Sequence, residues 1–139
     1  MVGFERVRCL SIRQPWAYLI LHAGKDVENR TWRGSFQGPL LIHAGQRFDE
    51  DALADPGIAR LVRGAFLETG GIVGACVVDG CVSASASPWF FGPHAFTLRA
   101  ARPIPFIACP GKLNFFRPPS GLVEGAAPHI ADLLAARTD

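Results

Sequence analysis

The chain has 139 residues, 49% of them apolar and 19% charged, with a formal net charge of +2. This composition excludes a disordered chain, and the net charge is too small to indicate a nucleic-acid binder by itself. No apolar run approaches the length that spans a bilayer, and the N-terminus lacks the hydrophobic stretch of a signal peptide. We therefore expect one cytoplasmic domain over residues 1–139, with no membrane partner.

The first third of the chain predicts a strand, a helix and two more strands. Residues 7–12 are short and apolar, and Pro15 is typical of a helix start because its missing N–H costs nothing there. Apolar residues then recur at helical spacing up to Gly24, a usual C-terminal stop. Residues 26–32 and 39–43 follow as predicted strands.

The remaining sequence predicts helical segments on either side of further strands. Residues 49–67 have a helical pattern broken at Asp55, and the second piece carries one apolar stripe, which is typical of a helix facing a core. That stripe consists of Ile58, Leu61, Val62, Ala65 and Phe66. The other predicted elements are strands at 71–82 and 94–101, one or two short strands within 104–116, and a helix at 128–136.

The cysteines and the charges narrow the possible ligands. The four cysteines form no CxxC pair and no zinc-type spacing with histidine, so buried reduced thiols are expected. Residues 80–123 contain no Asp or Glu, which predicts a positive side suited to an anionic ligand such as RNA. A chance imbalance on a solvated surface is the alternative. The basic residues of this stretch are Arg99, Arg102, Lys112 and Arg117.

The segment 24–32, Gly-Lys-Asp-Val-Glu-Asn-Arg-Thr-Trp, is the most informative part of the chain. In an extended strand Glu28 and Arg30 point to one face, close enough for an ion pair, and Lys25 lies at the strand entrance. Arg supplies 12 of the 14 basic residues, so a lysine here is unusual for this chain. The segment predicts a polar site, whereas the simpler alternative is a surface salt bridge that contributes little.

Two blocks, residues 9–17 and residues 24–30, together resemble the ASCH (activating signal cointegrator homology) domain, which has a Gly-x-Lys-x-x-Glu-x-Arg-like signature. Here Gly24 directly precedes Lys25, so Ala23 occupies the usual glycine position. Residues 39–44 and 87–93 also resemble bacterial members, and the resemblance is strongest over residues 7–118. It implies an α+β fold, namely a small mixed PUA-like β-barrel with helices packed around it.

The family resemblance also implies a link to RNA. One branch hydrolyses the acetyl amide of N4-acetylcytidine, and some bacterial members are reported to cut single-stranded RNA. We expect RNA or a modified nucleoside to bind in a cleft around Lys25, Glu28 and Arg30, and these three are the catalytic residues if the chain is a metal-independent hydrolase. The amidohydrolase branch has a threonine three residues after its lysine, and this chain has Glu28 there, which disfavours that reaction.

Six further residues are candidates for contacting the RNA or nucleoside. They are Ser11, Arg13, Gln14, Trp32, His43 and Trp89. Tryptophans can stack on unpaired bases, although large aromatics more often fill cores, which is the expectation for Trp16. His43 is either a base or a structural residue, and residues 89–91 would serve a protein partner if they formed an exposed apolar patch. No cofactor and no metal site is predicted, because the carboxylates do not cluster with histidines.

Overall fold

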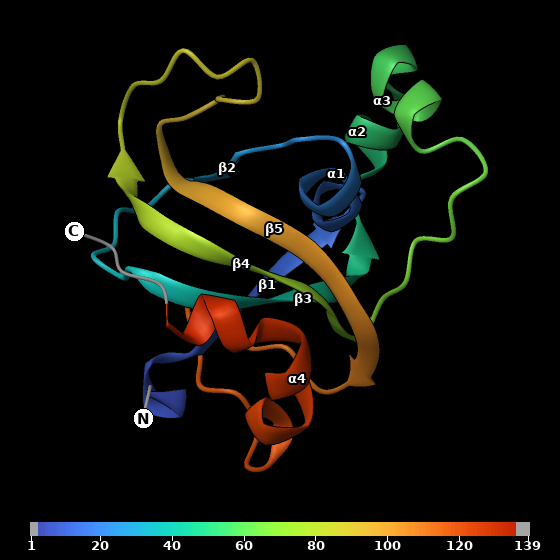
Figure 1. Cartoon of the computed structure of the whole chain (residues 1–139). Helices are drawn as coiled ribbons and strands as arrows, with labels where there is room; N and C mark the ends of the chain where they lie inside the picture. The colour runs from blue at the N-terminus through green and yellow to red at the C-terminus, as the bar shows by residue number, and fades with distance from the viewer. Residues whose placement is uncertain (1–2, 136–139) are drawn as a thin grey trace.

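The fold is built on one five-stranded mixed sheet, seen in a computed structural model that describes residues 3–135 (Figure 1). The strand order is β1-β3-β4-β5-β2, with β1 parallel to β3 and the other neighbours antiparallel. The strands are β1 (Arg8–Gln14), β2 (Val27–Arg30), β3 (Gly38–Phe48), β4 (Gly71–Val82) and β5 (His94–Ala108).

The expected α+β class is confirmed, whereas the closed barrel is not found. β1 and β2 form the two ends of the sheet, and within residues 3–135 no backbone ladder joins them. A side chain makes the connection instead, because Arg30 Nη2 donates to the backbone oxygen of Ser11 at 3.1 Å. β2 has only four residues and all of them pair with β5, so its contact with β1 is left to side chains.

Helices cover both faces of the sheet. α4 (Leu122–Leu134) packs on one face and α1 (Trp16–His22) on the other, as Figure 1 shows. Side chains of a strand alternate between the two faces, so Leu41 joins the core under α4 while Ile42 joins the core under α1. Most of β1 and β3 is therefore buried on both faces by these two cores.

Two strand predictions differ in outcome. The strand predicted at 71–82 is confirmed as β4. Instead of separate strands at 94–101 and within 104–116, β5 runs continuously for 15 residues, and Phe116 forms only an isolated bridge with Cys9. Register shifts between β4 and β5 allow the ladder to continue past Pro103, which has no N–H to donate.

The core-facing helix predicted within residues 49–67 is wrong. α2 (Glu50–Ala54) and α3 (Pro56–Leu61) are short, and α3 contributes no buried residue. Leu61 is 48% exposed and Phe66 is 84% exposed. Asp49 and Asp55 cap the two helices by accepting from backbone N–H groups, so local capping and not core burial stabilises this region.

The C-terminal helix begins earlier than the predicted residue 128. α4 starts at Leu122 and includes Pro128, with a kink at Ile130. The burial of Val123 and Ala126 in the core under α4 extends the helix upstream of residue 128. The predicted end at residue 136 lies outside the described residues.

We predict that a thiol reagent labels Cys81 far faster than Cys9 or Cys76. All four cysteines are free, and Cys81 is only partly buried. Burial raises the pKa of Cys9 and of Cys76 to about 12, so neither forms the reactive thiolate at mildly alkaline pH. Peptide mass spectrometry after timed alkylation measures the rates. Equal labelling of Cys76 and Cys81 in the folded protein would contradict the prediction.

Candidate functional site

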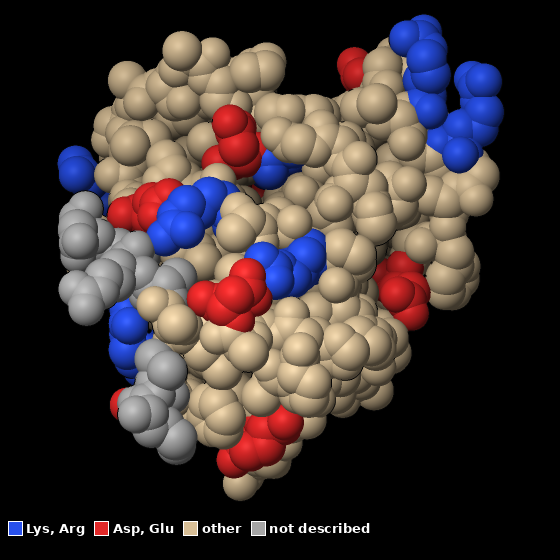
Figure 2. All heavy atoms as spheres, in the orientation of Figure 1, with Lys and Arg blue, Asp and Glu red and all other residues tan. Residues whose placement is uncertain are grey.

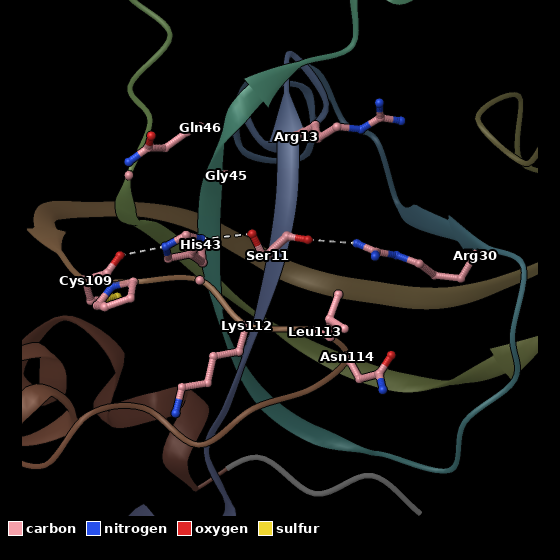
Figure 3. Close-up of a pocket in the computed structure, with 13 residues that line it drawn as sticks. Ser11, Arg13, Arg30, His43, Gly45, Gln46, Cys109, Lys112, Leu113 and Asn114 are labelled. Carbon is pink, nitrogen blue, oxygen red and sulfur yellow. Dashed lines mark hydrogen bonds between the residues drawn. The ribbon is translucent and has the colours of Figure 1, made fainter.

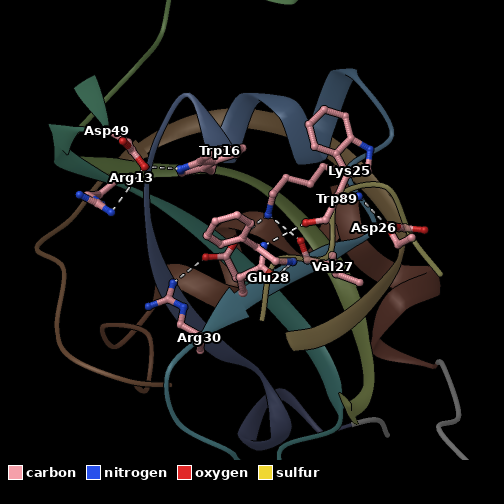
Figure 4. A network of polar contacts seen from close by, with 12 residues as sticks. Arg13, Trp16, Lys25, Asp26, Val27, Glu28, Arg30, Asp49 and Trp89 are labelled. Atoms are coloured by element: carbon pink, nitrogen blue, oxygen red, sulfur yellow. Dashed lines mark hydrogen bonds and ion pairs between the residues drawn. The ribbon is translucent and has the colours of Figure 1, made fainter. Parts of the chain in front are cut away.

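The carboxylate of Glu28 is the centre of a buried ionic network (Figure 4). Its Oε1 accepts from Lys25 Nζ at 2.9 Å, and its Oε2 accepts from Arg30 Nη2 at 3.0 Å. Lys25 Nζ also donates to the Val27 oxygen at 2.6 Å and lies 5.4 Å from the centroid of the Trp16 ring. The structure thus brings together the three residues that the sequence singled out as catalytic candidates.

The local chain path explains why these side chains meet. Gly24 has φ of +75°, which ends α1 in the left-handed conformation that glycine favours, and the Lys25 N–H then donates to the Leu19 oxygen. Glu28 is fixed by its pairing with Phe96 of β5. Lys25 is only 3% and Glu28 only 7% exposed, so their ion pair is buried. The Glu28–Arg30 pair, for which a weak surface bridge was the alternative, is also largely buried, with the Arg30 side chain 22% exposed.

A hollow of about 940 Å³ opens beside this network. We call it the tryptophan hollow, because all three tryptophans of the chain line it. Trp16 comes from α1, Trp32 follows β2, and Trp89 lies in the loop between β4 and β5. Its full lining is Ser11, Arg13, Trp16, Lys25, Glu28, Asn29, Arg30, Thr31, Trp32, Asp49, Asp51, Ala52, Asp55, Ile58, Pro88, Trp89, Phe90 and Phe91.

Trp16 and Trp32 each pack against core residues and also line the tryptophan hollow. Trp32 packs on Phe96, with ring centroids 5.3 Å apart, yet it is only partly buried and lines the hollow. Trp16 was expected in the core, but it is also partly buried and its Nε1 donates to Asp49 Oδ2 at 2.8 Å. The helical spacing of Trp16 indicated a buried stripe and could not show that the indole end reaches a cavity.

Asn29 holds the Trp89 loop, a role that sequence reasoning missed. Its Nδ2 donates to the Trp89 oxygen at 3.0 Å, and its Oδ1 accepts from the N–H groups of Phe91 at 2.7 Å and Gly92 at 3.0 Å. The signal was present, because asparagine is depleted in strands and so needs a reason to stand in β2. Phe91 itself is 91% exposed, whereas Trp89 and Phe90 are partly buried.

Asp49 is a second residue that the sequence reasoning did not assign to the site. It accepts from Trp16 Nε1, caps α2 through the Ala52 N–H at 3.1 Å, and lies 3.6 Å from Arg13 Nη2. The hydrogen bond from Trp16 is the main cause that lowers the pKa of Asp49, and the Ala52 N–H and Arg13 act in the same direction. Asp49 therefore holds an indole, a helix end and a guanidinium in one place.

A second hollow of about 690 Å³ lies beside the first (Figure 3). We call it the cationic hollow, since its charged lining residues are Arg13, Arg30 and Lys112. Ser11, Arg13 and Arg30 line both hollows, which therefore meet at the outer edge of β1. The other lining residues are His43, Gly45, Gln46, Gly70, Cys109, Pro110, Gly111, Leu113 and Asn114.

Ser11 and His43 are paired in register across β1 and β3, and their side chains are hydrogen-bonded. His43 Nε2 lies 2.8 Å from the Cys109 oxygen, and a carbonyl oxygen can only accept, so Nε2 carries the hydrogen. In the neutral ring, Nδ1 then accepts from Ser11 Oγ at 3.1 Å. His43 is 2% exposed and ties the loop after β5 to the sheet, while Ser11 is open to the hollow.

Gln14 is the one binding candidate that the structure brings to neither hollow. It is 2% exposed, and both ends of its amide serve the backbone. Its Nε2 donates to the Glu68 oxygen at 2.9 Å, and its Oε1 accepts from the Tyr18 N–H at 2.9 Å. Gln14 thus stabilises the start of α1 and the loop before β4. The strand-to-helix position suggested a ligand contact, but burial directs the side chain inward.

The positive side predicted from residues 80–123 is divided into ion pairs. Arg99 Nε donates to Asp79 at 2.9 Å, and Arg102 makes a bidentate pair with Asp132 at 2.7 and 2.8 Å. Figure 2 shows blue and red groups side by side on this face. Asp79 of β4 and Asp132 of α4 thus provide the carboxylates that residues 80–123 lack. Lys112, by contrast, lines the cationic hollow.

A metal centre and a membrane-spanning helix are both absent from the described part of the chain. Within residues 3–135, no group of three or more His, Cys, Asp or Glu side chains is placed to hold a metal ion. In the same range, no helix is both long and apolar enough to cross a membrane.

Comparisons with known proteins agree with the fold. The family profile of the ASCH domain matches residues 10–103. Activating signal cointegrator 1 of Mus musculus is 38% identical over 68 residues and that of Homo sapiens 45% over 42 residues, or 48% and 30% of this chain. These matches cover only 12% and 7% of those proteins. A crystallised ZmASCH mutant protein from Zymomonas mobilis aligns with a TM-score of 0.58 at 14% identity, covering 92% of this chain and 99% of that one.

We predict that losing Glu28 destabilises the protein more than losing Lys25. Glu28→Gln leaves the buried Lys25 ammonium without a counter-charge and should cost about 3–5 kcal/mol of unfolding free energy. Lys25→Met should cost less, because Glu28 keeps its contact with Arg30. Urea denaturation measures both changes. The double variant should be more stable than the sum of the two single effects indicates.

The matched control for this cycle is Asp79→Asn, which breaks the more exposed pair with Arg99. This substitution should lower the free energy of unfolding by no more than about 1 kcal/mol. The prediction is contradicted if the effects of Glu28→Gln and Lys25→Met on the free energy of unfolding are additive. It is also contradicted if Glu28→Gln lowers that free energy as little as the control does.

We predict that the stabilising contribution of Asp49 disappears in acid. Its folded-state pKa lies below the ordinary value of 3.8, so the contribution is fully present above that value and is lost as pH falls through the folded pKa. The stability difference between wild type and Asp49→Asn should therefore shrink below pH 3.8. Urea denaturation over a pH series measures this difference.

In Trp16→Phe, the Asp49 pKa should rise toward its ordinary value, because the hydrogen bond from the indole is lost. Carboxyl-carbon NMR follows this pKa.

Proposed function

This chain belongs to the ASCH domain family, and we propose that it binds single-stranded RNA, or a modified nucleoside derived from it, with a base in the tryptophan hollow. The observation that carries the proposal is that all three tryptophans line the same hollow as the Lys25–Glu28–Arg30 network. Stacking on an aromatic face adds about 1–3 kcal/mol per base and tolerates any base sequence. RNA modules use such faces to hold unpaired bases.

The polar wall of the hollow suits a nucleobase edge. Lys25 Nζ uses two of its donors on Val27 and Glu28, which leaves one for a ligand. Thr31 adds a hydroxyl that can donate or accept. These groups lie beside Trp16, Trp32 and Trp89, so a base that stacks on an indole can direct its hydrogen-bonding edge at them.

Binding is favoured over hydrolysis by the contacts of Glu28. Each of its oxygens already accepts from a cation, so taking a proton from water or from a ribose hydroxyl would weaken both ion pairs. Lys25 donates to two acceptors, a role that suits a hydrogen-bond donor to a ligand. In the alternative, a hydrolase of RNA or of N4-acetylcytidine, Glu28 would activate water while Lys25 or Arg30 stabilises the developing oxyanion. One set of incubations with RNA and N4-acetylcytidine separates binding from hydrolysis.

Tryptophan fluorescence tests this proposal directly, because every tryptophan lines the hollow. We expect single-stranded RNA oligonucleotides or N4-acetylcytidine to quench the emission in a saturable way. Trp89→Ala removes one stacking face and should weaken binding by about tenfold. Phe66→Ala is the control, since this aromatic residue is 84% exposed and lines neither hollow. Isothermal titration calorimetry measures affinity independently of emission.

Chromatography of the same incubations identifies the class of function. Product formed by the wild type and lost in Lys25→Met would establish the hydrolase. Saturable binding that is weakened by Trp89→Ala, with no product, would establish the binding module. Absence of binding to both ligands, or equal weakening by Trp89→Ala and Phe66→Ala, would overturn the proposal.

A further inference from the structure

We propose that the cationic hollow binds a phosphate of the same ligand, so that the chain recognises a nucleotide unit and not a nucleoside alone. This inference rests on the proposed function, because it assumes a base in the tryptophan hollow. The base and the phosphate would lie on opposite sides of the residues that both hollows share, Ser11, Arg13 and Arg30.

The charges of the two hollows differ in sign, and this difference carries the inference. The charged residues lining the tryptophan hollow are the cations Arg13, Lys25 and Arg30 and the acids Glu28, Asp49, Asp51 and Asp55. Those lining the cationic hollow are Arg13, Arg30 and Lys112, with no Asp or Glu among them. A phosphate is repelled by the first set and attracted by the second. An uncharged base is not repelled by the acids of the tryptophan hollow.

Arg30 is the residue best placed to contact a phosphate. Its Nη2 donates to Glu28 and to the Ser11 oxygen, which fixes the guanidinium at the edge of β1, as Figure 3 shows for the Ser11 contact. Among the described residues 3–135, its Nη1 has no hydrogen-bond partner, and its Nε is buried without one. Arginine presents paired donors that match phosphate oxygens. The Glu28 contact thus orients a donor that serves the neighbouring hollow.

Arg13 and Lys112 complete the cationic lining from two other elements. Arg13 lies in β1 and its side chain is 59% exposed, with one long contact of 3.6 Å to Asp49. Lys112 lies in the loop after β5 and is exposed. A ligand that enters between β1 and this loop would meet both, and the flexible lysine stem lets its ammonium follow a phosphate.

Two glycines leave room for the ligand at Ser11. A Cβ atom at Gly111 would lie 3.0 Å from Ser11 Oγ and 2.8 Å from His43 Cε1. A Cβ atom at Gly45 would lie 3.1 Å from Ser11 Oγ. Side chains at either position would therefore crowd the floor of the hollow beside the Ser11–His43 pair. The two glycines therefore leave space beside Ser11 in the cationic hollow.

Matched ligands test the subsite. We would titrate cytidine, cytidine 5′-monophosphate, cytidine 3′-monophosphate and the dinucleotide CpC, following tryptophan emission at low salt. We expect at least one phosphate-bearing ligand to bind at least about tenfold more tightly than cytidine, with an affinity that falls as salt rises. Excess inorganic phosphate should reduce its affinity to that of cytidine and leave cytidine binding unchanged.

Lys112→Ala should reduce the gain in affinity that the phosphate gives, because one of the three lining cations is lost, while cytidine binds as in the wild type. Arg117→Ala is the charge-matched control, because Arg117 is exposed in the same loop and lines neither hollow. If cytidine and all the phosphate-bearing ligands bind equally, or if both variants weaken nucleotide binding equally, the phosphate subsite is wrong while the base site stands. If none of these ligands nor longer RNA binds, the proposed function fails and the subsite fails with it.

Discussion

The carboxylate of Glu28 is the interaction on which the site depends. It is buried, and burial of a charge is costly unless the charge is paired. Lys25 and Arg30 provide that pairing from opposite sides, one at the end of α1 and the other at the end of β2. The three side chains thus hold each other in one geometry, with a net charge of one cation between them. That geometry places an ammonium in the tryptophan hollow and a guanidinium at the boundary with the cationic hollow.

The rest of the cleft is assembled around the outer edge of β1. The cores under α1 and α4 bury both faces of the sheet, so ligand-accessible groups gather where the sheet ends. Asn29 attaches the Trp89 loop to β2, Asp49 attaches Trp16 to α2, and His43 attaches the loop after β5 to β3. Each attachment is a side-chain contact between segments far apart in sequence. Polar side chains therefore set the positions of the loops that complete the cleft around the strand and helix residues.

The sequence predicted what is local and missed what depends on distant partners. Gly24, Lys25 and Glu28 lie within one helix end and one strand, so their convergence could be inferred from spacing alone. Residues 71–82 were predicted correctly because a long apolar run between glycines has few other interpretations. The exposure of Phe66 could not be predicted, since its helical stripe was the same as that of a buried helix. An asparagine in a strand indicated some role for Asn29, but the loop that it holds lies sixty residues later and could not be predicted.

Arg30 joins the ends of the sheet where a closed barrel would have a backbone ladder. A ladder opens only if several backbone hydrogen bonds break together, because they fix one strand against another. A single guanidinium can instead release the Ser11 oxygen by changing its rotamer, without moving either strand. The seam between β1 and β2 is thus held by a replaceable bond. Because the same Nη2 also donates to Glu28, any ligand that draws the guanidinium off Ser11 would strain the Glu28 pair as well, so the seam and the buried network respond together.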